Sequence, residues 1–173
     1  MSKERLVELI LNDYEAFKIE HDANSDMDIS EADFSHVNIE NADFTNIDFS
    51  GTSFVEANLL NVKFVDCDLT SADFSRAQIS ECDFSGSILN GTNFNYAILN
   101  YCEFSDADMA GANFSEADLT DSDLSTSENL ESCRFDESTI WPDSDKLPED
   151  FDCTYNYDLS TLRDDEDSAN EDY

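Results

Sequence analysis

The chain has 173 residues, of which 42 are Asp or Glu and only 8 are Lys or Arg, so its formal net charge is −34. Such a surface repels nucleic acid and anionic membranes and attracts basic proteins, so we expect no direct binding to nucleic acid. Gly and Pro number only 4 and 2, whereas Phe numbers 13, which excludes collagen-like and flexible-linker classes and favours one ordered domain.

Residues 1–26 are expected to form a capping helix and a linker. Five apolar or aromatic side chains recur there at helical spacing: Leu6, Leu9, Ile10, Tyr14 and Phe17. They predict one amphipathic helix over residues 3–20, whose apolar face covers the start of the region that follows. The first apolar run is broken by Glu8, and no run approaches the ~20 residues of a membrane span. We therefore expect a cytoplasmic protein without signal peptide or membrane contact.

Residues 27–126 repeat with a period of five. Every fifth residue is apolar, namely Ile29, Phe34, Ile39, Phe44, Phe49, Phe54, Leu59, Phe64, Leu69, Phe74, Ile79, Phe84, Leu89, Phe94, Leu99, Phe104, Met109, Phe114, Leu119 and Leu124. A small residue recurs two positions before these centres, Asp or Asn one position before, and Ser, Thr or Asn after them. The period matches neither the 3.6 of a helix nor the 2 of a flat strand.

Units such as ADFSH, ADFTN, ANLLN and ADLTD resemble the A(D/N)LXX motif of the pentapeptide repeat family. The match keeps one register through residues 27–126 and resumes after one inserted residue at Leu130, Phe135 and Ile140. The resemblance implies an all-β fold, a right-handed quadrilateral parallel β-helix with four pentapeptides per coil and an N-terminal capping helix. The repeat domain is then expected to span residues 27–141.

The distribution of rings favours four-sided coils independently of the resemblance. Every fourth centre falls on one side, which collects Phe34, Phe54, Phe74, Phe94 and Phe114, while the opposite side collects Phe44, Phe64, Phe84, Phe104 and Leu124. The other two sides are mostly aliphatic. This twenty-residue recurrence is expected if like side chains stack in columns within a close-packed core.

Acidic residues concentrate along two neighbouring sides of the expected rod. The positions before the centres hold Asp28, Asp48, Asp68 and Asp108 on one side and Asp43, Asp83, Glu103 and Asp123 on the next. We call the edge that these eight residues flank the acidic corner. Residues 27–126 contain 19 Asp and Glu against Lys63 and Arg76, a net charge of −17. At a rise of ~4.8 Å per coil this is one charge per roughly 1.4 Å, against about 1.7 Å in duplex DNA.

A stretch without charge interrupts this pattern between Asp83 and Glu103. Within it, solvent-facing slots hold Ile88, Tyr96, Ile98 and Tyr101. An uncharged coil on an acidic rod indicates a contact site for a partner or for a second copy. The sequence leaves a homodimer open.

Groups that carry chemistry are sparse. Four of the five Cys occupy inward slots and are expected to be buried free thiols: Cys67, Cys82, Cys102 and Cys133. Only His21 and His36 could titrate near neutral pH. The sequence contains no P-loop, GxSxG or HExxH motif and no GGxGxDxUx calcium repeat. We expect no catalytic residue, cofactor or metal.

Residues 142–173 are expected to form a C-terminal cap and an acidic tail. Trp141, Leu147 and Phe151 can close the last coil, and Pro142 and Pro148 stop strand growth. The acidic run over residues 164–172 has no apolar spacing, which predicts disorder.

These features predict a non-enzymatic protein-binding rod. The family resemblance implies an acidic DNA mimic that binds a basic DNA-binding protein such as a type II topoisomerase, either DNA gyrase or topoisomerase IV. Two alternatives remain at this point, a general scaffold for an unknown partner and a surface that binds cations. A coat of charge that only keeps the protein in solution would produce most of the same pattern.

Overall fold

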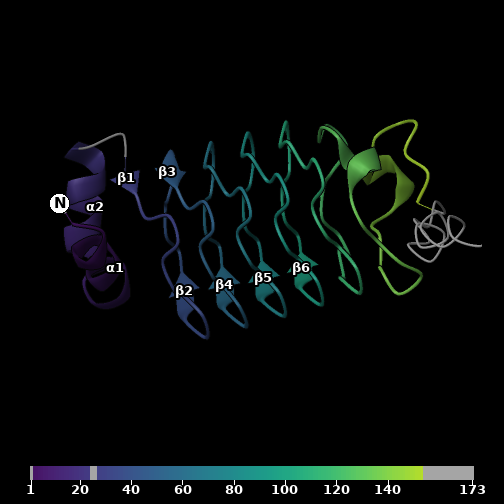
Figure 1. Ribbon diagram of the computed structural model, residues 1–173. Helices are drawn as coiled ribbons and strands as arrows, with labels where there is room; N and C mark the ends of the chain where they lie inside the picture. The colour runs from purple at the N-terminus through teal and green to yellow at the C-terminus, as the bar shows by residue number, and fades with distance from the viewer. Residues whose placement is uncertain (1, 24–26, 154–173) are drawn as a thin grey trace, which may run out of the picture.

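The computed structural model describes residues 2–23 and 27–153. Two helices, α1 (Lys3–Asn12) and α2 (Tyr14–Ala23), lie at one end of a stack of coils (Figure 1). Strands β1 (Met27–Asp28) and β3 (Ile47–Asp48) form one parallel pair. A four-stranded parallel sheet contains β2 (Asn38–Glu40), β4 (Asn58–Leu60), β5 (Gln78–Ser80) and β6 (Ile98–Asn100). Two 3-10 helices, η1 (Leu130–Ser132) and η2 (Ser144–Lys146), follow.

The coils contain twenty residues each, because residues twenty apart pair in parallel on all four sides. Representative pairs on these sides are Asp48↔Asp68, Ser53↔Asp73, Asn58↔Gln78 and Lys63↔Asp83. The expected β-helical solenoid is thereby confirmed, and the right hand of its coil stays a prediction. Among the described residues, no helix is long and apolar enough to cross a membrane.

The pentapeptide folds into a side and a corner through two local devices. The Asp before a centre typically accepts the backbone N–H two residues on, as in the 2.9 Å bond from Ser75 N to Asp73 Oδ1, and Asn93 and Asn113 do the same. From Glu31 to Asp121, the residue two after the centre adopts the left-handed conformation, with φ of 66° at Gly51 and 53° at Asn61. The repeated Asp and Asn therefore have a structural role in every side they occupy.

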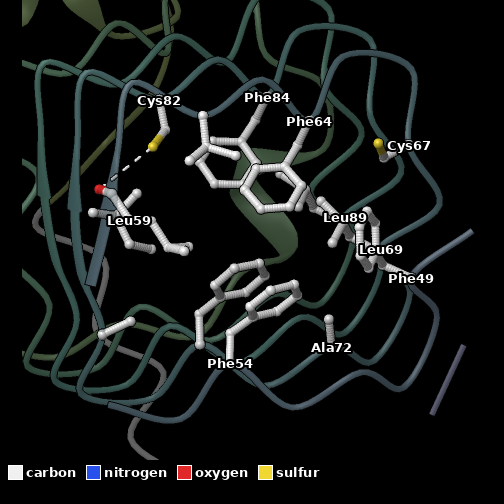
Figure 2. Packing of buried hydrophobic residues seen from close by; sticks show 14 of the residues in the cluster. Phe49, Phe54, Leu59, Phe64, Cys67, Leu69, Ala72, Cys82, Phe84 and Leu89 are labelled. Carbon is white, nitrogen blue, oxygen red and sulfur yellow. Dashed lines mark hydrogen bonds between the residues drawn. The ribbon is translucent and has the colours of Figure 1, made fainter. Parts of the chain in front are cut away.

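The core contains the two ring columns expected from the sequence, together with aliphatic side chains from the other two sides. Phe74 stacks on Phe54 with ring centroids 4.7 Å apart and on Phe94 at 5.2 Å. Across the interior, Phe64 meets Phe74 edge-on at 5.9 Å. Phe64 also stacks on Phe84 at 5.1 Å (Figure 2). Stacked and edge-on pairs both suit the ring quadrupole, so each phenyl ring contributes contacts in three directions.

The small slot two residues before the centre is buried from Ala42 to Ser122, as predicted, whereas Ala32 and Val37 near the cap are only partly buried. Where this slot holds a hydroxyl, the side chain donates to a carbonyl of the previous coil. Thr92 Oγ1 lies 2.8 Å from the Leu69 oxygen, and Ser122 Oγ lies 2.8 Å from the Leu99 oxygen. Buried polar side chains here are therefore satisfied, which removes the cost of burying them.

The N-terminal cap differs from the single helix expected, because the chain breaks at Asp13. This residue ends α1 with non-helical backbone angles, φ of −152° and ψ of 70°, and its Oδ1 accepts the Ala16 N–H at 3.1 Å near the start of α2. An Asp that bonds the backbone locally favours a new helix start over continuation. The core ends beneath the cap, where Phe17 packs on Phe44 at 5.7 Å.

The cap also covers the backbone edge of the first coil. The Tyr14 hydroxyl lies within hydrogen-bond distance of the Asp43 backbone N–H and oxygen, and the His21 ring lies 2.7 Å from the Thr45 oxygen. Lys3 Nζ donates to the Ser30 oxygen at 2.6 Å. The first coil has no preceding coil with which its backbone could pair. These bonds from the cap satisfy part of that exposed backbone edge instead.

The C-terminal end contains one register error in the sequence interpretation. Leu130 and Phe135 are buried centres as expected, but Ile140 is 52% exposed and pairs with Asp118. A second inserted residue shifts the register, so Trp141 takes the inward place, packing against Phe135 at 5.2 Å and Phe151 at 5.0 Å. The predicted closing role of Trp141, Leu147 and Phe151 is confirmed. The acidic run over residues 164–172 lies outside the described residues.

Candidate functional site

The first column of the acidic corner lies on the side that carries β1 and β3. Asp28, Asp48 and Asp68 pair in consecutive coils. Ile88 then takes the place of an acid, and Asp108 and Glu128 continue the column. The structure therefore brings the four acids predicted for this side into one line, interrupted by a single apolar residue.

The second column lies on the side that precedes the first. Here Asp43, Lys63, Asp83, Glu103 and Asp123 pair in consecutive coils. The side chain of Lys63 is the one cation in this column, so the negative potential is divided into a single carboxylate near the cap and a run of three beyond it. This run of three carboxylates is the most continuous acidic segment of the second column.

Two acids that the sequence interpretation missed stand on the edge between the columns. Asp66 and Asp106 occupy the left-handed position, with φ of 55° and 57°, and follow the centres Phe64 and Phe104. The period of five was sufficient to find them, because every residue two after a centre turns a corner. Their carboxylates add charge to the acidic corner itself.

An open recess of about 360 Å³ lies at the cap end of the acidic corner. Its lining combines two apolar side chains and five polar ones: Met27, Asp28, Asn46, Ile47, Asp48, Asp66 and Asp68. Carboxylates on an apolar base suit the aliphatic stem and charged head of a Lys or Arg side chain.

Hydrogen bonds favour the ionised form of four of the eight carboxylates of the acidic corner and lower their pKa: Asp28, Asp43, Asp108 and Asp123. The hydroxyl and the backbone N–H of Ser125 bond to Asp123 at 2.7 and 2.9 Å and hold its pKa below the usual value. Bonds from Ser30 lower the pKa of Asp28 in the same way. These four carboxylates therefore keep their negative charge to pH values below those at which free Asp titrates.

Glu103 is the exception within the second column. Partial burial, followed by the like charges of Asp123 and Asp83, raises its pKa. A carboxyl whose pKa rises on folding costs stability above that pKa, and the cost disappears as pH falls through it.

E103Q is therefore expected to raise the free energy of unfolding at pH 7 by about 0.2–1 kcal/mol, a small gain because solvent screens the site. Thermal unfolding followed at pH 7 and at successively lower pH checks this, and the advantage should shrink as Glu103 takes up its proton. A stability difference that does not change with pH would contradict this origin.

The four residues of the uncharged coil do not share one side. Ile98 lies in β6, with Tyr96 and Tyr101 at the corners before and after it. Ile88 instead lies within the first acidic column, between Asp68 and Asp108. The coil therefore presents three of its exposed apolar residues to one side and the fourth to the acidic corner.

The two tyrosines are held along the rod by contacts with other coils. A hydrogen bond to Glu116 raises the pKa of Tyr96, and one to Asp121 raises that of Tyr101. The Arg76 guanidinium lies 4.9 Å from the centre of the Tyr96 ring, a cation–π contact. Both rings are thereby fixed beside Ile98.

The inward thiols have little chemistry available to them. Burial raises the pKa of Cys67, Cys82 and Cys133 to about 12, and it raises that of Cys102 as well. Cys82 Sγ points to the Leu59 oxygen at 3.7 Å (Figure 2). Since the thiolate is the reactive species, these groups are inert at neutral pH.

We expect a single thiol, that of the exposed Cys153, to react with Ellman's reagent in the native protein. The four buried thiols should become reactive only after unfolding in denaturant, giving five per chain. The absorbance of the released thiolate gives both counts. Rapid reaction of a second thiol in the native state would show that the small slot is open to solvent.

Metal and acid–base groups are also isolated. Within residues 2–23 and 27–153, no three His, Cys, Asp or Glu side chains are grouped as a metal site. His36 Nδ1 pairs with Glu56 at 3.2 Å on the surface, and His21 contacts the backbone of the first coil.

Comparison with known proteins identifies the repeat. A family model described as a pentapeptide repeat region matches residues 25–94 and 60–140. No curated protein matches the chain. The solved pentapeptide repeat protein Rfr23 from the cyanobacterium Cyanothece 51142 is 21% identical with a TM-score of 0.65, over 75% of this chain and 97% of that one.

Two further solved structures are similar over a smaller part of this chain and with lower TM-scores. A pentapeptide repeat protein of the Arabidopsis thaliana thylakoid lumen is 30% identical, with a TM-score of 0.45, over 54% of this chain and 68% of that one. QnrB1, a plasmid-mediated fluoroquinolone resistance protein, is 17% identical, with a TM-score of 0.28, over 65% of this chain and 92% of that one. Because the matched residues of the family model make up more than half of the sequence, the chain belongs to the pentapeptide repeat family.

Proposed function

We propose that this protein is a non-enzymatic rod whose acidic corner binds a basic surface on a DNA-binding protein in the place of DNA. The observation that carries the proposal is the charge density along the axis. A net charge of −17 over residues 27–126 gives one charge per roughly 1.4 Å when coils rise ~4.8 Å. Duplex DNA carries one per about 1.7 Å.

The arrangement of the carboxylates supports the proposal beyond their number. Pairing twenty residues apart places Asp83, Glu103 and Asp123 in consecutive coils. Their spacing is therefore fixed by the backbone, and a rigid array loses little entropy when it docks. Long-range attraction from such an array also accelerates encounter with a basic partner.

A type II topoisomerase, DNA gyrase or topoisomerase IV, is the partner we propose from the family resemblance. Such enzymes hold duplex DNA in a basic groove, and a rod of like charge density could occupy it. The proposal places both proteins in the cytoplasm.

The experiment is a pull-down from cell lysate with the full chain as bait, at about 0.05 M and about 0.5 M NaCl. Salt screens exposed charges, so a partner held by the acidic corner should be captured at low salt and released at high salt. Recovery of a basic DNA-binding protein in the first condition alone is the expected result. If every partner captured resists high salt, the general-scaffold alternative replaces mimicry.

A further inference from the structure

The strands β2, β4, β5 and β6 form one side of the rod, which we call the strand face (Figure 1). Exposed apolar side chains collect on this side. Leu60 in β4 is 37% exposed, Ile98 in β6 is 42% exposed, and Ile140 is 52% exposed. Tyr96 and Tyr101, 43% and 61% exposed, flank Ile98 at the two corners. Five such residues on one side exceed the scattered apolar exposure of an ordinary surface.

These residues recur at every second coil. Leu60 lies two coils before β6, in the column of Ser80 and Asn100, and therefore stands two strand positions from the column of Ile98. The column of Ile98 continues through Asp118 to Ile140. At ~4.8 Å per coil, the three levels are separated by about 10 Å along the axis. Two turns of an α-helix rise about 10.8 Å, so apolar residues seven apart on a helix can reach successive levels.

The charges beside this apolar row define the opposing chemistry. The column before the centres on the strand face holds three neutral polar residues, Asn38, Asn58 and Gln78, and one carboxylate, Asp118, between Ile98 and Ile140. The corners carry exposed carboxylates, Glu56 and Glu116 on one edge and Glu81 and Asp121 on the other. A complementary ligand is therefore apolar at the levels of Leu60, Ile98 and Ile140, carries a basic or polar residue opposite Asp118, and is basic along both flanks.

A second copy of this chain does not satisfy that requirement. Its strand face would bring its own corner carboxylates against the same groups, and both copies carry a net charge of −34. Arg76 could neutralise only part of this repulsion, since it is already held over Tyr96.

We propose that the strand face is a docking surface for an amphipathic α-helix of a partner protein, laid along the rod axis, with apolar residues at seven-residue spacing and Lys or Arg on both flanks. A helix laid across the rod would contact the apolar residues of a single coil, because each strand is only three residues long. A helix laid along the axis can contact the apolar residues of three levels. This site is separate from the acidic corner, and its contacts depend on apolar burial more than on charge.

The test uses a fluorescein-labelled helical peptide of about 18 residues, with Leu at seven-residue and intervening four-residue spacing and Lys on the flanks. A scrambled peptide of equal composition measures attraction by charge alone. Fluorescence anisotropy with the full chain at about 0.5 M NaCl, where exposed charges are screened, should detect binding of the patterned peptide and not of the scrambled one.

Two variants locate the site. In I98N/Y101N, each new Asn stands in a column that already holds Asn, namely Asn38 and Asn58 for position 98 and Asn41 and Asn61 for position 101. We therefore expect the fold to be retained, and thermal unfolding checks this. It should weaken peptide binding by at least about tenfold, and L60T should weaken it less. The matched control is I88N, because Ile88 has the same 42% exposure as Ile98 but lies on the acidic corner. Its affinity should be unchanged.

Three outcomes would overturn the proposal. The first is equal affinity of I98N/Y101N and I88N, and the second is equal binding of the scrambled peptide. The third is self-association in sedimentation that I98N/Y101N abolishes while the peptide does not compete, which would assign the face to a second copy. Neutralising the acidic corner should leave peptide binding at high salt unchanged. A negative result for the strand face would therefore leave the proposal of DNA mimicry standing, and the reverse also holds.

Discussion

Replacing Phe74 or Phe94 with alanine is expected to lower the free energy of unfolding by about 3–5 kcal/mol. Phe74 is fully buried, with ring contacts to Phe54, Phe64, Phe84 and Phe94 at 4.7–5.9 Å. Deleting one ring leaves a cavity between its two stacked neighbours. Because the backbone ladder holds these neighbours in place, the cavity cannot close. Chemical denaturation followed by circular dichroism measures the loss.

S75A is the matched control for this prediction. Ser75 follows Phe74 and faces outward, and its backbone N–H, which alanine keeps, donates to Asp73 Oδ1 at 2.9 Å. We expect a change within about 0.5 kcal/mol. Equal and small effects of F74A, F94A and S75A would show that the centres do not form the core.

Much of the solenoid could be predicted because the repeat carries its own register. A period of five with a twenty-residue recurrence of rings places Phe54, Phe74 and Phe94 in one column, and the structure stacks them. The same period of five predicted that four of the thiols occupy the inward slot. Each such inference needs only the chain period, since every pentapeptide repeats the same local geometry.

Prediction failed where the period stops. Helical spacing continues through Asp13, but the side chain bond to Ala16 starts a second helix there. The second insertion before Ile140 is recognised only when Asp118 is paired with it. Ile88 was grouped with Ile98 because they are close in sequence, although ten residues correspond to opposite sides of a four-sided coil.

Neutralising the second acidic column is the other change with a large expected effect. The variant D43N/D83N/E103Q/D123N removes four negative charges from one side of the acidic corner. Affinity for a basic partner should fall by at least about tenfold, because several exposed pairs of ~0.2–1 kcal/mol are lost together. Single substitutions fall within the error of most binding assays, so titration calorimetry on the quadruple variant is the appropriate measurement.

The amide substitutions are chosen because these acids also shape the turn. Asp83 and Asp123 accept the backbone N–H of Ser85 and Ser125 at 3.0 and 2.9 Å. Asn113 makes the equivalent 3.1 Å bond with Ser115, so an amide oxygen preserves the local fold. Alanine would remove turn and charge together, and a binding loss would then have two explanations.

The control for this prediction is a variant that changes charge elsewhere. Asp73 and Asp118 precede centres on the two sides that do not flank the acidic corner. D73N/D118N should reduce affinity less per charge removed than the quadruple variant does. Equal loss per charge in both variants would mean that the partner senses net charge and no particular surface.

Competition with duplex DNA decides whether the acidic corner imitates nucleic acid. A purified DNA-binding partner recovered from the pull-down is mixed with the labelled full chain, and unlabelled duplex is added at constant ionic strength. We predict that DNA displaces the protein stoichiometrically and that the quadruple variant is displaced at lower DNA concentration. A ternary complex that persists at saturating DNA, with unchanged affinity for the labelled chain, would contradict mimicry.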